Sequence, residues 1–522
     1  MTSPTSQQLT RLENHVNKHG LPISRGLEKE GLRADADFNI SQLGHPQALG
    51  HPLTHPMITT DYSEALLELI TPVFDSGKEL LNNLKETHQY LSNNIEGEVM
   101  WAGSMPCKID GEESIRIAQY GDSNIGKLKY VYRQGLGVRY GRVMQSIAGL
   151  HYNFSLSDEF WQDYKRSFKS KSNQSLKDFK SEQYFCLIRN FRRYSWLLMY
   201  LFGASPALDQ SFLGHDNHAL KAFDQEGTLY MPHATSLRMG DLGYHNNAQS
   251  SLAICFNTLS NFTTTLGHAI HTSYPKYEHI GIKRDDEFVQ LNTNILQIEN
   301  EYYSSIRPKR TTESGETPRH ALNERGVEYI EVRCLDLNPF LELGISEKQI
   351  DFLDTFLIYC LLKDSPFIQE AECKSLDQNF NSVVNHGRKP GLMLEKGNTE
   401  IALSEWASEL LQDMKSVTEV LGQDAKDSRY QDSLNEQIQK VQQPELTPSA
   451  QVLAAMKQES LSWLQFAGQL SSKHKTTLTK QESHSKQSFY QRTATTSFSE
   501  EKAINEADNI SFEQYMKVYQ KD

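Results

Sequence analysis

The stretch "RGLEKEGLRAD", residues 25–35, places two glutamates among three basic residues in one short run. In a β-strand, side chains at positions i and i+2 point to the same face, roughly 7 Å apart, so Glu28 and Glu30 would lie side by side. Two carboxylates at that separation repel each other unless a cation, a proton or water lies between them. Taken alone, the stretch is better explained as a solvated surface strand than as a functional site, and the rest of the chain has to decide.

The composition limits the class of protein. The chain has 522 residues, which is enough for one very large domain or two to four ordinary ones. Its net charge of -13 argues against a nucleic-acid-binding protein, which normally has a basic surplus. The balance fits a soluble protein that binds metal cations or small molecules. A hydrophobic content of 38% is enough for a substantial core.

Targeting and redox signals favour a cytoplasmic protein. The first residues lack the charged and apolar regions of a signal peptide. The most apolar window, "YSWLLMYLFGASPAL" at 194–208, is too short to cross a bilayer, so we expect no membrane attachment. The six cysteines are scattered without a C-x-x-C pair, which is typical of reduced thiols.

Hydrophobic periodicity predicts strands and helices in irregular order. The predicted helices are 8–19, 78–95, 180–202 and 345–364, and the predicted strands are 25–35, 65–74, 150–156 and 326–337. This order favours an α+β fold with an antiparallel sheet over a doubly wound one. From about residue 470 the chain is polar and rich in Ser, Thr and Lys, which predicts a mobile or loosely packed segment before a last amphipathic helix. We therefore expect two parts, residues 1–470 and 471–522.

Several familiar motifs are incomplete. "GDSNIGKL", residues 121–128, is nearly a P-loop, but Leu128 stands where a Ser or Thr hydroxyl must reach Mg²⁺. The pairs His215/His218 and His268/His271 have helix-compatible ligand spacing without an obvious third ligand. The chain has no G-x-S-x-G, H-E-x-x-H or G-x-G-x-x-G sequence, so serine-hydrolase, zincin and dinucleotide-binding functions lack support.

Acidic residues recur on other apolar strands. Glu68 interrupts "ALLELITP", with Asp61 shortly before it, and Glu331 shares a strand face with Arg333 in "GVEYIEVR". His151 lies on the polar face of "LHYNFSL". Each alone fits a half-exposed strand or a structural ion pair. Together, carboxylates and one imidazole favour a hard-cation site for Mg²⁺ or Mn²⁺, and so many acids imply more than one ion and a polyphosphate ligand.

Basic residues could supply the complementary charges. Arg307, Lys309 and Arg310 lie in "SSIRPKRTTESGE", where they would form either a phosphate clamp or a solvated basic turn. Arg133 and Arg238 could bind carboxylates or a transferring phosphate, although each alone looks like a surface arginine.

Seven blocks of sequence together resemble one family. In chain order they are "RGLEKEGLR", "TTDYSEALLELITP", "QSIAGLHYNFSL", "YLFGASPA", "ATSLRMGDLGY", "LQIENEYYSSIRPKR" and "GVEYIEVRCLDLNPF". They resemble the proteobacterial type of glutamate–cysteine ligase, also called γ-glutamylcysteine synthetase, from about residue 8 to at least residue 400.

The resemblance implies a fold and a reaction. The fold would be like that of glutamine synthetase, with a curved, mainly antiparallel sheet that forms a funnel and helices outside, and residues 1–470 would be the catalytic domain. The enzyme would join L-glutamate to L-cysteine through a γ-glutamyl phosphate, using ATP and two or three Mg²⁺ ions, as the first step of glutathione biosynthesis. Mn²⁺ could replace Mg²⁺. Glutathione would be expected as a feedback inhibitor.

The resemblance also implies roles for individual residues. The metal ligands would be Glu28, Glu30, Asp61, Glu68, His151 and Glu331. Glutamate and the transferring phosphoryl group would be bound by Arg238, Arg333 and Arg133. The nucleotide-binding residues predicted from the basic stretch itself are Arg307, Lys309 and Arg310. The cysteine pocket would consist of Tyr62, Tyr132, Leu136, Gln145, Tyr244 and Tyr303. Position 62 is a departure, because the better-known members have Phe there and the added hydroxyl alters the thiol pocket.

Three other functions stay open at this point. A ligase of the same fold could use another amine acceptor than cysteine. A metal-dependent phosphohydrolase could use the same acids and release phosphate from ATP alone. A catalytically dead relative would act as a binding protein, although every implied metal ligand is present.

Overall fold

The centre of the molecule is a seven-stranded antiparallel sheet. The computed structural model describes residues 4, 6–168, 171–213, 219–240, 242, 256–313, 316–423, 428–479 and 484–519. The strand order is β11-β12-β5-β1-β3-β2, and β4 pairs with β1. The strands are β1 (Ile23–Ala34), β2 (Ile58–Thr60), β3 (Leu66–Ile70), β4 (Val99–Met100), β5 (Leu150–Leu156), β11 (Ile306–Lys309) and β12 (Tyr329–Leu335). This sheet, with helices packed outside it, confirms the predicted α+β class.

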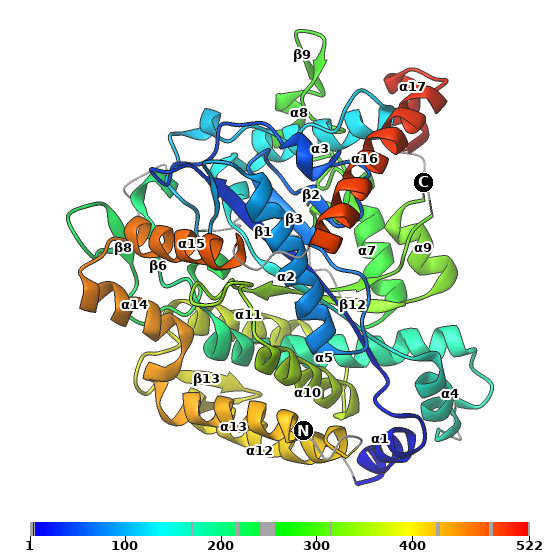
Figure 1. Ribbon diagram of the computed structural model, residues 1–522. Helices are drawn as coiled ribbons and strands as arrows, with labels where there is room; N and C mark the ends of the chain where they lie inside the picture. The colour runs from blue at the N-terminus through cyan, green and yellow to red at the C-terminus, as the bar shows by residue number, and fades with distance from the viewer. Residues whose placement is uncertain are drawn as a thin grey trace.

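Helices form layers on either side of this sheet. Below it in Figure 1 lie α5 (Leu176–Phe202), α10 (Glu347–Leu362) and α11 (Glu370–His386), with α12 (Leu403–Leu421) and α13 (Arg429–Gln442) outside them. Above it lies α3 (Asn124–Tyr140). Helix α10 begins as its sequence predicts, because the Ser346 hydroxyl accepts a hydrogen bond from the Gln349 amide.

The remaining elements surround this core. The helices are α1 (Ser6–His19), α2 (Gly77–Asn94), α4 (Asp158–Arg166), α7 (Leu259–His271), α8 (Pro275–Ile280), α9 (Pro318–Arg325), α14 (Pro448–Glu459), α15 (Trp463–Thr479), α16 (His484–Ala507) and α17 (Phe512–Tyr519). Small sheets are formed by β6 (Ala207–Asp209), β7 (Lys221–Ala222) and β8 (Thr228–Tyr230), by β9 (Lys283–Arg284) and β10 (Glu287–Phe288), and by β13 (Met393–Lys396) and β14 (Thr399–Ala402).

Strand β1 separates its charges between its two faces. Alternation along the strand places Glu28 and Glu30 on one face and Arg25, Lys29 and Arg33 on the other. All three basic side chains are buried. Burial lowers the pKa of Lys29 to about 7. The stretch that opened the sequence analysis is therefore an internal strand.

A buried ion pair fixes the basic face of β1 to α10. The Arg25 Nη2 lies 2.6 Å from the Asp354 Oδ2, and neither side chain is exposed by more than 1%. The Tyr152 hydroxyl donates a hydrogen bond to the other Asp354 oxygen, at 2.5 Å. Arg25 also donates to the Tyr430 hydroxyl of α13, at 3.3 Å, so Arg25 and Asp354 together join strands β1 and β5 to two helices.

The C-terminal region differs from its prediction. The segment predicted to be mobile or loosely packed forms parts of helices α15 and α16, which the sequence did not predict, and the last helix, α17, is present. The Tyr490 ring of α16 stacks on Tyr90 of α2 with ring centroids 4.9 Å apart, and its hydroxyl lies 2.8 Å from that of Thr87. A few such anchors hold a largely polar helix in place. The expected boundary at residue 470 falls inside α15, and the division into two parts stays a prediction.

Three smaller predictions can be compared with the structure. The near-P-loop begins α3 instead, because the Ser123 hydroxyl accepts from the Gly126 amide as a helix cap. The cysteines in the described part of the chain are free, and Cys255 lies outside it. Within the described residues, no helix is both long and apolar enough to span a membrane.

The Arg25–Asp354 pair generates a stability prediction. We expect Asp354→Asn to lower the free energy of unfolding by about 3–5 kcal/mol, because it leaves the Arg25 charge buried without its counter-ion. Urea unfolding followed by circular dichroism would measure the change. Glu370→Gln, at the exposed Lys374–Glu370 pair, is the matched control and should change it by less than about 1 kcal/mol. Equal effects of the two variants would contradict the assigned role of the buried pair.

Candidate active site

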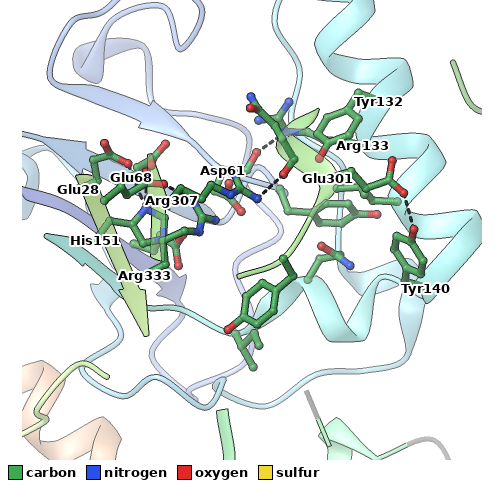
Figure 2. Close-up of a pocket in the computed structure, with 18 of the residues that line it drawn as sticks. Glu28, Asp61, Glu68, Tyr132, Arg133, Tyr140, His151, Glu301, Arg307 and Arg333 are labelled. Carbon is green, nitrogen blue, oxygen red and sulfur yellow. Dashed lines mark hydrogen bonds and ion pairs between the residues drawn. The ribbon is translucent and has the colours of Figure 1, made fainter. Parts of the chain in front are cut away.

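One pocket of about 260 Å³ gathers nearly all of the predicted site residues. Figure 2 shows Glu28, Glu68 and His151 at one end of it, Tyr132, Tyr140 and Glu301 at the other, and Asp61 between. The predicted residues that line it are Glu28, Glu30, Asp61, Tyr62, Glu68, Tyr132, Arg133, Leu136, Gln145, His151, Arg238, Tyr303, Arg307, Lys309, Glu331 and Arg333. Of the others, Arg310 lines an adjoining pocket, and Tyr244 lies outside the described residues.

Strand register brings the acids together. Glu28 on β1 is opposite His151 on β5, and Glu30 is opposite Glu68 on β3. On the far side of β5, Glu331 of β12 is opposite Asn153. Because directly opposed residues share a sheet face, residues more than 300 positions apart in sequence converge on one surface.

His151 lies at the centre of this acidic surface. Its Nδ1 is 3.1 Å from the Glu28 Oε2 and 3.8 Å from the Glu331 Oε1, and its Nε2 is 3.4 Å from the Glu30 Oε1. Asn153 donates to the second Glu28 oxygen at 2.8 Å. One imidazole and one amide thus hold part of the cluster in place.

The acids on the β2–β3 side are poorly compensated. No described residue makes a hydrogen bond or ion pair with the Glu68 carboxylate. Burial, followed by the charges of Glu28, Asp61, Glu30 and Glu331, raises the pKa of Glu68 well above its usual value. Burial also raises the pKa of Asp61, with Glu30 as the second cause.

On the β11–β12 side, basic side chains compensate the acid. Glu331 lies 3.3 Å from the Lys309 Nζ and 3.0 Å from the Arg333 Nη1. Burial by itself would raise the pKa of Glu331, but Lys309, Arg333 and His151 outweigh it and hold that pKa well below the usual range. The pocket therefore has an acidic side and a basic side.

Two arginines approach the pocket, Arg333 from β12 and Arg238 from the short helical turn Leu237–Met239. The Arg238 Nη2 donates to the Arg333 carbonyl at 3.1 Å. A Cβ at position 149 would lie 1.8 Å from this nitrogen, so only glycine lets Arg238 reach its place. The buried Nε of Arg333 has no hydrogen-bond acceptor among the described residues, which leaves a donor for an anionic ligand.

Arg133 extends from α3 towards the acidic side. Its Nε donates to the Asp61 carbonyl, and its guanidinium carbon lies 4.6 Å from the centre of the Tyr120 ring. This stacking holds the guanidinium flat against the ring, while its charge lowers the pKa of Asp61 against the effect of burial.

Aromatic residues form part of the pocket wall. Tyr62, Tyr132 and Tyr303 line it together with Leu136 and Gln145, and these residues are the aromatic corner that the resemblance assigns to cysteine. The buried Tyr62 hydroxyl has no hydrogen-bond partner among the described residues. It is therefore a polar group available to a ligand in an otherwise apolar corner.

Four residues that line the pocket were not predicted from the sequence: Tyr140, Ile147, Asn300 and Glu301. Glu301 lies 3.0 Å from the Arg139 Nη1 and accepts from the Gln297 amide at 2.6 Å. It also accepts from the Tyr140 hydroxyl. These contacts attach the end of α3 to the loop that precedes β11. The alternating acids of "QIENE" could have drawn attention to Glu301, but its partners on α3 are more than 150 residues away.

A second, adjoining pocket of about 340 Å³ shares residues with the first. Arg307 and Lys309 line both, and Arg310 lines the second with Tyr302, Pro308 and Tyr329. Arg307 donates to the Asn300 carbonyl at 2.9 Å, so it also orders the loop between the two pockets.

Two overlapping groups of side chains could hold metal ions in the pocket. One is Glu28, His151 and Glu331, and the other is Glu30, Glu68 and His151, with the ligand atoms of each group within 4.8 Å of one another. The unpartnered Glu68 carboxylate and the predominance of oxygen ligands fit a hard divalent cation. The alternative pair His268/His271 joins no such group among the described residues, and His215/His218 lies outside them.

Comparison with known proteins gives one consistent family. The family described as glutamate-cysteine ligase matches residues 9–383. The chain is 52% identical to a glutamate–cysteine ligase of Hahella chejuensis over 99% of both chains, and 49% identical to that of Azotobacter vinelandii over 95% of this chain and 94% of the relative.

Solved structures show the same fold. A glutamate–cysteine ligase of Francisella tularensis, in complex with AMP, superposes with a TM-score of 0.90 at 35% identity, covering 96% of this chain and 98% of that one. A bifunctional glutathione synthetase of Pasteurella multocida superposes with a TM-score of 0.69 at 25% identity, covering 90% of this chain and 54% of that one.

The unpartnered acid predicts an unusual gain in stability. We expect Glu68→Gln to stabilise the metal-free protein at pH 8, because burial and the neighbouring carboxylates disfavour the charged form of Glu68 in the folded state and raise its pKa. As pH rises from the ordinary pKa of the acid towards its raised pKa, the stability of the folded state falls by about 1.4 kcal/mol for each pH unit. The neutral glutamine avoids this loss.

Thermal unfolding in EDTA at pH 8 would measure this gain, which should shrink at pH 5. Glu419→Gln, at an exposed position on α12, is the control and should not stabilise. A destabilised Glu68→Gln variant would contradict the electrostatic account.

Proposed function

The chain belongs to the glutamate–cysteine ligase family, and we propose that the pocket described above is where its reaction takes place. The enzyme uses ATP to join the γ-carboxylate of L-glutamate to the amine of L-cysteine through a γ-glutamyl phosphate, the first step of glutathione biosynthesis. The observation that carries the assignment of the site is the polarity of one cavity. Acidic, basic and aromatic side chains all line it, with Arg307 and Arg333 near the acids Glu28 and Glu68, and Tyr132 at the opposite end.

The acidic end suits Mg²⁺. Glu28, Glu30, Glu68, Glu331 and His151 would hold two or three ions together with phosphate oxygens of ATP, and Mn²⁺ could take their place. Asp61 would complete the set. When bound, these ions supply charge neutralisation and alignment of the phosphates during phosphoryl transfer.

The cations would act on the reacting groups themselves. Arg333 keeps a buried Nε donor free of protein acceptors among the described residues, which supports a contact with the γ-carboxylate or the transferring phosphoryl group. Arg238 is held beside it by the Arg333 carbonyl and would bind the same anions. Fixed positive charge at this place stabilises the negative charge that develops as the phosphoryl group moves. Arg133, beside Asp61, would extend this charge to the acidic side.

The adjoining pocket would take the rest of the nucleotide. Its shared residues Arg307 and Lys309 would lie beside the phosphates, and Arg310 would face the sugar or base beyond them. The relative from Francisella tularensis was solved in complex with AMP, which supports a nucleotide site in this fold.

The chemistry has two steps. The γ-carboxylate of glutamate attacks the γ-phosphorus of ATP, and ADP leaves. The amine of cysteine then attacks the acyl carbon, loses a proton, and phosphate leaves as the amide forms. The chain's residues contribute mainly by holding three substrates in line.

The aromatic corner would receive cysteine. Tyr132, Leu136 and Tyr303 offer the apolar surface that a small thiol side chain prefers, and Gln145 adds a polar contact. Tyr244, predicted for the same pocket, lies outside the described residues. Because glutathione contains a γ-glutamylcysteine part, it would compete for this corner as a feedback inhibitor.

Omission of single substrates tests the assignment. ADP release with Mg-ATP should require both glutamate and cysteine and should yield the γ-glutamyl dipeptide. Release with glutamate alone, unchanged by cysteine, would indicate another amine acceptor. Release from ATP alone would indicate a phosphohydrolase and would overturn the cysteine pocket.

The metal site generates a catalytic prediction. We expect Glu28→Gln to lower kcat at least ~100-fold without loss of the fold, because it removes a charged ligand from the centre of the cluster. ADP release and circular dichroism would measure both properties. The exposed Glu419→Gln variant serves as control, and full activity of Glu28→Gln would remove Glu28 from the metal site.

The unpartnered Tyr62 hydroxyl generates a specificity prediction. If it bonds to bound cysteine, Tyr62→Phe should raise the KM for cysteine about two- to tenfold, the cost of one neutral hydrogen bond, and leave kcat nearly unchanged. Steady-state kinetics with cysteine as the varied substrate would show it. An unchanged KM would mean that the hydroxyl does not contact the substrate.

A further inference from the structure

A second cluster of metal-ligand side chains lies away from the pocket, between helices α1 and α4. Figure 1 shows the two helices side by side at the lower right. His15 and His19 are one helical turn apart on α1, and Asp163 projects from α4. Their ligand atoms all lie within 4.8 Å of one another.

Both imidazoles converge on the same carboxylate oxygen. The His15 Nδ1 is 3.0 Å from the Asp163 Oδ2, and the His19 Nε2 is 3.5 Å from that same oxygen. In a tetrahedral zinc site with bonds of about 2.0–2.1 Å, two ligand atoms lie about 3.3–3.4 Å apart. The two separations from the Asp163 oxygen lie on either side of this value, and the two ring nitrogens are within 4.8 Å of each other, so the spacing suits a zinc ion.

The surroundings orient these ligands. Arg166 binds the other oxygen of Asp163 at 2.6 Å, which leaves Oδ2 directed at the histidines. His15 is buried, and its ring packs edge-on against Phe160 at 5.4 Å between centroids. His19 is 35% exposed, so water can reach the fourth position of a tetrahedral ion. Partners of this kind around the ligands are characteristic of protein metal sites.

We propose that His15, His19 and Asp163 form a zinc site that joins α1 to α4. Two imidazole nitrogens and one carboxylate oxygen form a ligand set of intermediate hardness. Such a set suits Zn²⁺ and not Mg²⁺, in contrast to the oxygen-rich pocket. The site is independent of the ligase mechanism, because none of its three residues lines the pocket.

Its place in the fold suggests what the ion would do. Helix α1 leads into the start of β1 and α4 follows the end of β5, where Ile23 is paired with Leu156. An ion between the helices would therefore hold together the chain segments next to one end of β1 and β5, the two strands that carry Glu28 and His151. Its role would be structural, as a further link between two helices that already pack on each other through His15 and Phe160.

Zinc titration of the untagged full-length enzyme tests the proposal. With excess Mg²⁺ present to occupy the oxygen-rich pocket, calorimetry should detect one tight Zn²⁺ site. His19→Ala and Asp163→Asn should each weaken that site at least ~10-fold, because each removes one of three ligands. Co²⁺ should give the visible absorption of a four-coordinate ion in the wild type, and this absorption should disappear in His19→Ala.

Two controls keep the result specific. His268→Ala removes an exposed histidine of the α7 pair and should leave the tight site unchanged. Ligase activity without added zinc should be the same in His19→Ala and in the wild type. The proposal is overturned if the wild type has no tight site, if His19→Ala binds Zn²⁺ as the wild type does, or if Glu28→Gln, and not His19→Ala, removes the site.

Discussion

The separation of charge across strand β1 is the constraint on which the site depends. A strand that carried five charges on one face could not be buried, but alternation sends its basic side chains to one face and Glu28 and Glu30 to the other. On the basic face, Arg25 pairs with Asp354 and Arg33 with Glu98, at 2.6 and 2.7 Å. Because these two arginines are paired with carboxylates on one face of the sheet, neither of them can neutralise Glu28 and Glu30 on the other face.

The acids must therefore be compensated from elsewhere. Lys309 and Arg333 do so for Glu331 on the β12 side. Glu68, on the other side of β1, has no such partner among the described residues. Its raised pKa reflects the free energy needed to charge a buried carboxylate beside other acids. A cavity with surplus carboxylates at one end is poorly suited to stability and well suited to divalent cations. The fold maintains it because the backbone ladders of β1, β3 and β5 fix the positions of these side chains.

Strand alternation and the resemblance predicted many residues that line the pocket, but not the contacts between residues that are far apart in the sequence. Period-two patterning was enough to place Glu28 beside Glu30, and Glu331 on the face of Arg333, because the rule is local. Glu30 is opposite Glu68 because of the register between β1 and β3, and a short stretch of sequence does not specify that register. Glu301 escaped notice because its partner Arg139 is 162 residues away. The C-terminal helices were misjudged because a composition poor in aliphatic residues hides single anchors such as Tyr490, whose effect depends on a partner in α2.

The unequal distribution of charge gives the two sides of the pocket complementary roles in the proposed mechanism. Cations on the β11–β12 side would attract the phosphates and the γ-carboxylate, whereas the acids of β1 and β3 would repel them. Divalent ions would neutralise those acids and bind the phosphates at the same time, so that nucleotide and metal each complete the site for the other. The two halves share His151, which faces Glu28, Glu30 and Glu331 together. A single imidazole on the central strand pair is thus the point at which the acidic and basic halves of the pocket are joined.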